Sequence, residues 1–421
     1  MMKRKFYLSI LIIFIIAGKV HAQFTVTGEI RPRAEFRNGF KTLNNESTDP
    51  AFFIEQRSRL YLDYKNEKFV FRLTFQDIRL WGENPQIFKA DNALFNVHEA
   101  WGQYNFSEKS ALRVGRQELD YDNARFLGNL AWAQQSRSHD LAKFTYDAGD
   151  LQFHVGAAFN QEDVISNPEP RRLSGTLYAT GGNYKTMQFA WFHKDYEKSD
   201  FSLLFLNNGV QSLADSSVNF SQTLGFIGKR SLGKINLEGE LYYQFGNDPS
   251  GRDLSAYLAS LSLKFKAGLL PITIGADILS GTDPGSSKSN AFTPLYGTNH
   301  KFYGFMDYFY VGNGHGNVGL RDFFIKSKIK TGQKSGLIIH LHEFLSNATI
   351  MDGDNNESSS VLGTEIDLVY NLDIAKEVNF KLGYSQLFAS DSMEIIKGGD
   401  KSELNNWAWA MLTIKPVLFK K

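Results

Sequence analysis

The stretch that decides the fold is FTVTGEIRPRAEFR, residues Phe24 to Arg37. Its even-numbered positions are apolar or small, and its odd-numbered positions carry five charges. Because side chains alternate between the two faces of a strand, this period of two predicts a β-strand with one apolar and one charged face. A strand of a soluble sandwich would show the same alternation, so targeting, repetition and connection lengths must decide which face meets water.

The N-terminus has the parts of a secretory signal peptide. A basic start at residues 3–5 precedes an apolar run at residues 6–18, and the small residue Ala22 precedes Gln23. The run is shorter than the roughly 20 residues that a membrane helix needs, and no second run of that kind follows. We therefore predict a signal peptide at residues 1–22 and a single mature domain at residues 23–421 that has no membrane helix.

Composition excludes several classes of function. Removal of residues 1–22 takes away four basic residues and no acid, so the formal charge falls from +1 to −3. Such a balanced surface argues against a nucleic-acid partner. Cysteine is absent, which rules out disulfides, thiolate metal sites and a Cys nucleophile. Aromatic residues at 14%, with 36 Gly and only 10 Pro, suit a large all-β protein.

Strand-like runs follow one another along the whole chain, with connections that alternate between short and long. Short turns are expected near residues 66–67, 107–110, 147–150, 194–198, 231–234, 266–270, 332–335 and 373–377. Longer connections are expected near residues 38–50, 80–93, 119–138, 162–183, 211–218, 246–253, 283–318, 347–360 and 390–404. Eight short turns and nine long loops delimit eighteen strands. Short periplasmic turns and long extracellular loops are typical of an outer-membrane barrel.

The first hairpin allows a prediction of register. A two-residue turn at Asn66-Glu67 would place Arg59 opposite Thr74, and by the same count Arg57 opposite Gln76 and Leu60 opposite Leu73. Polar residues would then face polar ones and apolar residues apolar ones, as a correct register requires.

The width of a closed eighteen-stranded sheet decides which face is wet. The interior of so wide a barrel cannot be filled by strand side chains alone and holds water. The charged face therefore points into the lumen and the apolar face meets lipid, and a closed barrel is the form in which strands can span a membrane. The sequence predicts an all-β protein, an 18-stranded antiparallel transmembrane β-barrel in the outer membrane.

Several separated motifs resemble those of the alginate-export family of outer-membrane porins, in a version typical of Bacteroidetes. They are GRQEL (115–119), GNLAWAQQSRSHD (128–140), DILSGTD (277–283), FTPLYGTNHKFYGFMDYF (292–309) and LGTEIDL (362–368). The resemblance implies an eighteen-stranded, monomeric barrel whose arginine-rich lumen passes an anionic polysaccharide outward, without cofactor or catalysis.

The distribution of arginine supports an anion path. Of 16 Arg that follow residue 22, 11 lie between residues 23 and 146. Those with lumen-facing parity are Arg31, Arg33, Arg57, Arg59, Arg72 and Arg113, and acidic residues that also point inward are Glu29, Glu55, Asp63 and Glu99. Guanidinium groups bind carboxylates bidentately and stay charged. The same segment carries 16 acids against 17 bases, so a salt-bridge ladder that braces the wall or a plug is an alternative, and both roles can hold at once.

Later strands offer weaker signals. Four lysines share the inward parity and could extend the path, although lysine there can also simply solvate the lumen: Lys326, Lys328, Lys330 and Lys381. His340 and His342 share a face and could bind a metal ion, but no third ligand is evident in the sequence, and we expect them at the bilayer interface. The connection at 283–318 could equally fold into the mouth as a lid or form an extracellular flap.

Two other motifs are interpreted as structural. The run Asp352 to Glu357 lacks the Gly that an EF-hand calcium loop has at its sixth position, so we expect a solvated extracellular loop. Ser138 and His139 are adjacent and would point to opposite faces of a strand, which excludes a catalytic dyad.

We predict an outer-membrane channel, without enzymatic activity, that passes anionic solutes or an anionic, alginate-like polysaccharide along an arginine-lined lumen. The alternatives are a weakly selective diffusion porin for nutrients and, in another class, an outer-membrane enzyme. Predicted partners are outer-membrane lipid and, during biogenesis, the barrel-assembly machinery, which would read the aromatic end of the last strand at Phe419.

Overall fold

The computed structural model describes residues 22–83, 94–160, 183–212, 217–309 and 317–421. The predicted signal peptide at residues 1–22 therefore lies almost wholly outside the described residues. No helix among the described residues is long and apolar enough to span a membrane.

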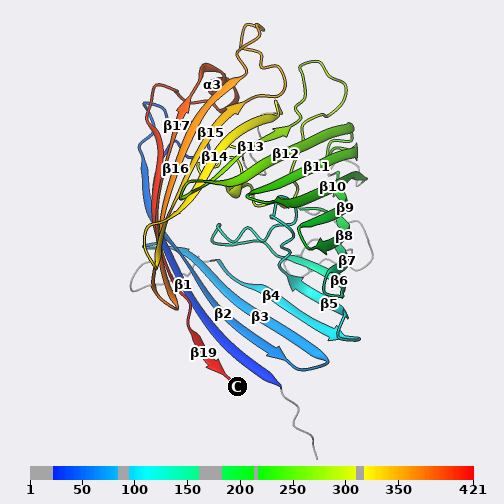
Figure 1. Cartoon of the computed structure of the whole chain (residues 1–421). Coiled ribbons are helices and arrows are strands. Elements are labelled where there is room, and N and C mark those ends of the chain that lie inside the picture. Colours follow the sequence, from blue (N-terminus) through cyan, green and yellow to red (C-terminus); the bar gives the residue numbers. More distant parts are fainter. Residues whose placement is uncertain (1–21, 84–93, 161–182, 213–216, 310–316) are drawn as a thin grey trace, which may run out of the picture.

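Almost every described element is a β-strand (Figure 1). The first nine strands are β1 (Gln23–Asn38), β2 (Ala51–Lys65), β3 (Phe69–Leu80), β4 (Leu94–Asn105), β5 (Ser110–Gln117), β6 (His139–Asp147), β7 (Leu151–Phe159), β8 (Thr186–Tyr196) and β9 (Ser199–Gln211). The remaining strands are β10 (Val218–Leu232), β11 (Ile235–Asn247), β12 (Asp253–Ala267), β13 (Leu270–Leu279), β14 (Leu320–Lys330), β15 (Ser335–Leu345), β16 (Val361–Ala375), β17 (Val378–Ala389), β18 (Asn405–Ile414) and β19 (Val417–Lys420). Two short helices, η1 (Asn299–Lys301) and α3 (Asp391–Lys397), lie in connections.

The strands form one closed antiparallel sheet in chain order. Each strand from β1 to β17 pairs with the next, and β1 closes the ring by pairing with β18 and with β19. The last two strands occupy one position of the wall, because both run along β1 and are separated only at Lys415-Pro416. Proline lacks the N–H that a continuous ladder would use. The predicted eighteen-stranded barrel is therefore confirmed, with its last strand in two pieces.

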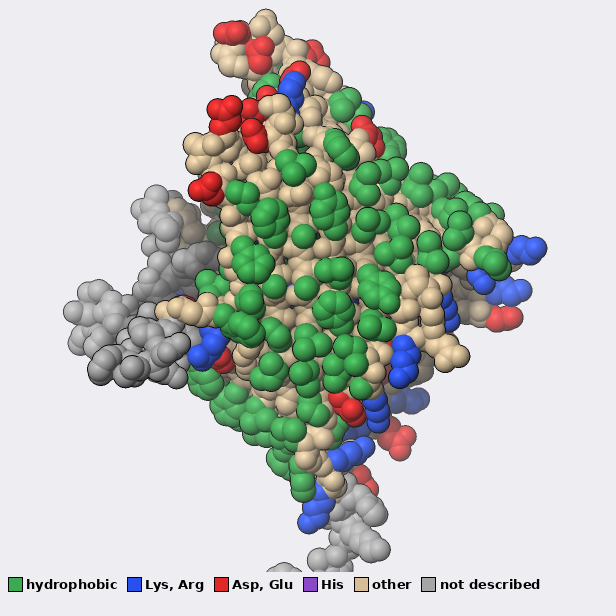
Figure 2. All heavy atoms as spheres, turned by 90° about the vertical axis from the view of Figure 1, so that its left-hand side faces the viewer, with side chains coloured by type: hydrophobic (Ala, Val, Ile, Leu, Met, Phe, Trp, Pro, Cys, Tyr) green, Lys and Arg blue, Asp and Glu red, His purple; other side chains and the backbone are tan. Residues whose placement is uncertain are grey.

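The two faces of the wall differ as the alternation predicts. Outward side chains such as Leu241, Phe323 and Ile325 are about half exposed, whereas the inward carboxylates of Asp277 and Glu365 are almost fully buried. Figure 2 shows apolar side chains across the middle of one outer face, with charged groups mostly above and below them. This is the surface that a barrel presents to lipid.

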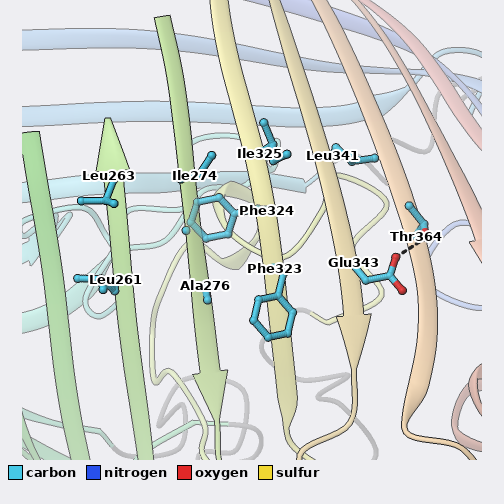
Figure 3. A pocket seen from close by; sticks show the side chains of 11 residues that line it. Leu261, Leu263, Ile274, Ala276, Phe323, Phe324, Ile325, Leu341, Glu343 and Thr364 are labelled. Atoms are coloured by element: carbon cyan, nitrogen blue, oxygen red, sulfur yellow. Dashed lines mark hydrogen bonds between the residues drawn. The ribbon is translucent and has the colours of Figure 1, made fainter. Parts of the chain in front are cut away.

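A shallow hollow of the outer wall illustrates this surface (Figure 3). It lies over the small side chain of Ala276, and its other lining residues are mostly large and apolar, including Leu261, Ile274, Phe323 and Ile325. A lining of this kind suits a lipid acyl chain and offers a polar solute few partners.

The register of the first hairpin differs from the prediction. Arg59 lies opposite Gln76, not Thr74, and Leu60 lies opposite Phe75; Arg57 accordingly faces Ile78. The turn is formed one residue later than expected, because the Asn66 side-chain oxygen accepts hydrogen bonds from the N–H groups of residues 68 and 69 at 2.9 and 2.7 Å. The pairing slips by two residues, so every side chain keeps its predicted face.

Two of the long connections fold into the barrel. We expected residues 119–138 among the extracellular loops, and this is wrong: the segment runs across the inside of the barrel, in cyan in Figure 1. Residues 280–309 also turn inward, which agrees with the lid alternative. Both segments bury apolar side chains that the wall alone does not cover, among them Phe126, Leu127, Phe292, Tyr303 and Met306.

Candidate functional site: the plugged lumen

The inward segment at residues 118–138, called here the crossing segment, is held at one end by arginines of β1 and β2. Arg31 donates from Nη1 to the carbonyl oxygen of Ala131 at 2.8 Å and from Nη2 to the side-chain oxygen of Gln134 at 2.9 Å. Arg57 donates to the hydroxyl of Ser136 at 3.0 Å and to the carbonyl of Gln134 at 3.3 Å. Carbonyls of an irregular segment lack ladder partners, and these guanidinium groups satisfy them.

Arg57, and Arg33 of β1, are also paired with acids of the wall. Arg57 lies 2.6 Å from Glu29, and Arg33 lies 2.7 Å from Glu35 and also contacts Glu55. Arg33 donates in addition to the carbonyl of Trp132 at 2.9 Å. Each guanidinium thus joins the wall to the crossing segment. The contacts of Arg31, Arg33 and Arg57 agree with the alternative prediction that the arginines brace the wall or a plug.

The far end of the crossing segment is anchored by Arg125, which the sequence did not single out. It bonds Glu240 of β11 at 2.9 Å, Asp277 of β13 at 3.0 Å and the hydroxyl of Tyr303 at 2.8 Å. Arg125 is 2% exposed, and its guanidinium stacks 4.0 Å from the Phe302 ring centre. Its acidic partners lie 115 and 152 residues away in the sequence, so neighbouring residues gave no signal of the pairing.

Trp132 lies in the middle of the crossing segment and joins both inward segments to the wall. Its ring stacks on His300 at 4.5 Å, meets Trp409 of β18 edge-on at 4.7 Å, and carries the Arg33 guanidinium at 4.4 Å. Aromatic and cation–π contacts of this kind add to the area they bury. The two inward segments therefore pack as one plug.

Buried charge within the plug stays ionised. Arg137 donates to the carbonyl oxygens of Gly128 and Gly297 at 3.2 and 3.1 Å. Burial lowers the pKa of its guanidinium to about 10, which leaves it charged at neutral pH. A permanent cation bound to carbonyls of both segments ties them together.

The three remaining predicted arginines differ in their partners. Arg59 bonds Gln76 at 2.6 Å and lies 3.7 Å from Glu118. Arg72 pairs with Asp63 at 2.6 Å and with Glu99 at 3.4 Å. Among the described residues, Arg113 donates only to the amide oxygen of Gln103, at 2.8 Å from Nη2, and it stacks over Trp101 at 3.8 Å.

A second group of basic side chains lies near the short-turn end of the lumen. Arg113 of β5 stands directly opposite Lys143 of β6, and both point inward. Lys328 and Lys381 also face the lumen at this end, each within four residues of a short turn. Among the described residues, none of these four makes an ion pair within 4.0 Å.

The other sequence candidates do not form catalytic or calcium sites. The Nδ1 atom of His139 lies 2.9 Å from the Tyr184 hydroxyl, and within the described part of the chain no serine is its partner. Asp352 accepts hydrogen bonds from the N–H groups of residues 354 and 356 in an exposed turn. The interface position expected for His340 and His342 is wrong, because both rings face the lumen and His342 is fully buried.

A closed sheet with an apolar outer surface and a charged, plugged interior defines an outer-membrane β-barrel channel, a protein of the transporter class. The chain belongs to the alginate export family, whose model matches residues 22–405. This agrees with the motifs that the sequence carries between residues 115 and 368.

Solved structures with low sequence identity share the fold. Acinetobacter baumannii OccAB4 aligns with a TM-score of 0.62 at 10% identity, over 94% of this chain and 98% of that one. A BenF-like porin from Pseudomonas fluorescens Pf-5 gives 0.61 at 11% identity, over 94% and 99%. Pseudomonas aeruginosa OccK10 (OpdN) gives 0.58 at 12% identity, also over 94% and 99%. No curated protein matches the sequence.

Proposed function

We propose that this channel passes anionic solutes, and that an anionic polysaccharide of the alginate class is its substrate. The observation that carries the proposal is the cross-strand pair Arg113 and Lys143. Like charges directly opposite each other destabilise a sheet, and among the described residues neither side chain makes an ion pair with a carboxylate within 4.0 Å, although Glu99 and Asp147 interact with them at longer range. A passing carboxylate would offset this repulsion.

The proposal divides the basic residues of the lumen into two groups. Arg31, Arg33 and Arg57 are occupied by carbonyls and carboxylates, so they hold the plug. Arg113, Lys328 and Lys381 are the members of the predicted path without an ion pair at the short-turn end, and Lys143, which the sequence did not single out, joins them. A polyuronate carries a carboxylate on every sugar, so each sugar would meet this basic group in turn. Rings of charged side chains set the ion selectivity of a pore in this way.

A weakly selective diffusion porin is the second candidate. It is favoured by the pairing of most other lumen charges, such as Arg72 with Asp63 and Glu99. A lumen with balanced charge attracts neither anions nor cations strongly. A measurement of ion selectivity therefore distinguishes the diffusion porin from the anion channel.

The first test is the reversal potential of the channel in a planar bilayer under a salt gradient. We expect anion selectivity in the unmodified protein, and we expect Arg113→Gln with Lys143→Gln to lower the anion-to-cation permeability ratio roughly threefold, about 0.7 kcal/mol for two partly screened charges. Arg116→Gln is the matched control, because Arg116 is an exposed residue of the same strand paired with Asp140 at 2.8 Å. A zero or cation-favouring potential of the unmodified channel contradicts the anion path.

The substrate class has its own measurement. Alginate oligomers added on the short-turn side should block the current, and neutral oligosaccharides of equal length should not. Equal block by both would support the diffusion porin. We further propose that residues 1–22 are the export signal, that the barrel is a monomer, and that Phe419 contacts the assembly machinery.

A further inference from the structure

The inner wall over β14, β15 and β16 carries a second polar cluster that the channel function does not use. His340 and His342 of β15 lie directly opposite Asp367 and Glu365 of β16. Asp322 of β14 lies within hydrogen-bonding distance of the His342 ring. We propose that His340, His342 and Asp367 form a binding site for a divalent transition-metal ion such as Zn²⁺.

The geometry of the three side chains fits this ligand set. One donor atom from each of His340, His342 and Asp367 lies within 4.8 Å of the other two. Donors of a tetrahedral zinc site are about 3.3 Å apart, given metal–ligand bonds of about 2.0 Å. Small rotations of these three side chains would shorten the separations of their donor atoms to the distance that a zinc ion requires. Antiparallel pairing already holds the residues in register, because His340 and Asp367 are cross-strand partners.

The atoms that would bind the ion have no other partner. Nδ1 of His340, Nε2 of His342 and Oδ2 of Asp367 are buried without a hydrogen bond. His342 and Asp367 are fully buried. Buried polar atoms are almost always satisfied, and each orphan carries a desolvation cost. One bound cation would satisfy these three atoms together, and the neighbouring Oε2 atom of Glu365 is likewise buried without a hydrogen bond.

A neighbouring carboxylate fixes the orientation of the buried imidazole. The Nδ1 atom of His342 lies 2.9 Å from both oxygens of Asp322, so Nδ1 donates and Nε2 keeps its lone pair. A carboxylate–histidine pair of this kind orients most metal-bound histidines. The other oxygen of Asp367 accepts a hydrogen bond from Ser385 at 2.5 Å, which fixes that carboxylate as well.

The local charge leaves room for a cation. Asp322, Glu365 and Asp367 have no Lys or Arg within 4.0 Å among the described residues. The ammonium of Lys326 interacts with this group electrostatically but donates its hydrogen bond to the carbonyl of Phe302 at 3.2 Å. One ammonium does not balance three carboxylates. Arg125 on the adjoining wall is already engaged with its own two acids, Glu240 and Asp277.

The inward segment at residues 280–309 covers the cluster. The Phe305 ring lies 4.9 Å from the His340 ring, and the N–H of Met306 donates to Glu365 at 2.9 Å. A bound ion would therefore stiffen the wall directly beneath the plug. Two imidazoles and one carboxylate select Zn²⁺, Co²⁺, Ni²⁺ or Fe²⁺ over Ca²⁺ and Mg²⁺, which prefer oxygen ligands. Three protein ligands also leave a fourth position for water or a solute.

The test uses the full-length protein without a histidine tag, folded in detergent and stripped with a chelator. Zn²⁺ binding is measured by titration and metal analysis, and Co²⁺ binding by its visible absorption. We expect one ion per chain. We expect Asp367→Asn to weaken binding by more than the roughly 10- to 100-fold that loss of an outer-shell partner costs, because it removes the charge of a direct ligand, and we expect His340→Gln with His342→Gln to abolish binding. Folding of each variant is checked by its heat-modifiable mobility in gels.

His139→Gln is the matched control. His139 is also a buried, inward-facing histidine with an unpartnered Nε2 atom, but it belongs to no cluster of metal ligands among the described residues. Its loss should leave binding unchanged. Binding of much less than one ion by the unmodified protein overturns the proposal, and so does an equal loss in the His139 variant. If the double variant does not fold, the Asp367 variant and the Co²⁺ spectrum of the unmodified protein decide.

Discussion

At the scale of single residues, identical side chains have different roles in this lumen. Arg125 is fully enclosed with two carboxylates, Arg31 bonds mainly backbone carbonyls, and Arg113 has only an amide oxygen and an indole ring. A guanidinium that is already surrounded by acceptors has no donors left for a solute. The role of each arginine therefore follows from its partners and not from its lumen-facing parity.

Arg125 gives a prediction on stability. Arg125→Gln leaves Glu240 and Asp277 buried without their cation, and removing one partner of a buried ion pair costs about 3–5 kcal/mol. The temperature at which the folded band disappears in heat-modifiable electrophoresis should fall clearly. Arg116→Gln, which breaks the exposed pair with Asp140, should cost at most about 1 kcal/mol. If Arg125→Gln and Arg116→Gln lower the unfolding temperature equally, burial of the Arg125 cluster contributes nothing to the stability of the barrel.

At the scale of elements, the crossing segment depends on the wall that it touches. It has no β-ladder of its own, and its carbonyls are satisfied by Arg31, Arg33 and Arg57 from β1 and β2. Irregular backbone at membrane depth is tolerated only where it is enclosed by protein or lines a water-filled cavity. The arginines of these two strands therefore hold one end of the plug in place.

The combined change Arg31→Gln and Arg57→Gln should release one end of this segment. Single-channel conductance should rise severalfold and become noisier, because a loose plug obstructs the pore less. Arg37→Gln is the control, since Arg37 lies on the same strand but pairs with Glu35 at 2.8 Å and makes no contact with the segment. An unchanged conductance with a large shift in ion selectivity would mean that these arginines line the path and do not hold the plug.

At the scale of the whole molecule, the barrel is closed at β1. The short strand β19 completes this seam: Phe24 and Lys421 exchange backbone hydrogen bonds of 3.1 and 2.9 Å, and Val26 pairs with Phe419. An open edge in lipid exposes unpaired backbone groups at several kcal/mol each.

Deletion of residues 417–421 should therefore lower the folded fraction in the membrane and the temperature of unfolding. Phe419→Leu keeps the backbone pairing and removes only the aromatic ring. The measurement is the folded fraction after refolding into lipid vesicles. If β19 acts by closing the seam, the deletion should lower this fraction strongly and Phe419→Leu should lower it only slightly. If the substitution is as harmful as the deletion in cells but not in vesicles, the ring acts during assembly.

Much of the architecture could be read from local pattern. The period of two at Phe24 to Arg37, repeated through the chain, fixed the strands, their faces and the number of wall positions, because strand geometry depends on each residue and its neighbours. The hairpin register was off by two residues, since the side chain of Asn66 moved the turn and alternation cannot detect an even slip.

The contents of the lumen were decided by the tertiary structure. The inward course of the crossing segment and the anchoring of Arg125 to β11 and β13 join residues far apart in the sequence. The third ligand beside His340 and His342 comes from the neighbouring strand β16, through a strand register that alternation alone does not give. The sequence by itself determined that the chain closes into a cylinder with an apolar exterior. Only the closed wall brings those distant side chains within bonding distance, because their meeting depends on the curvature and diameter of the whole barrel.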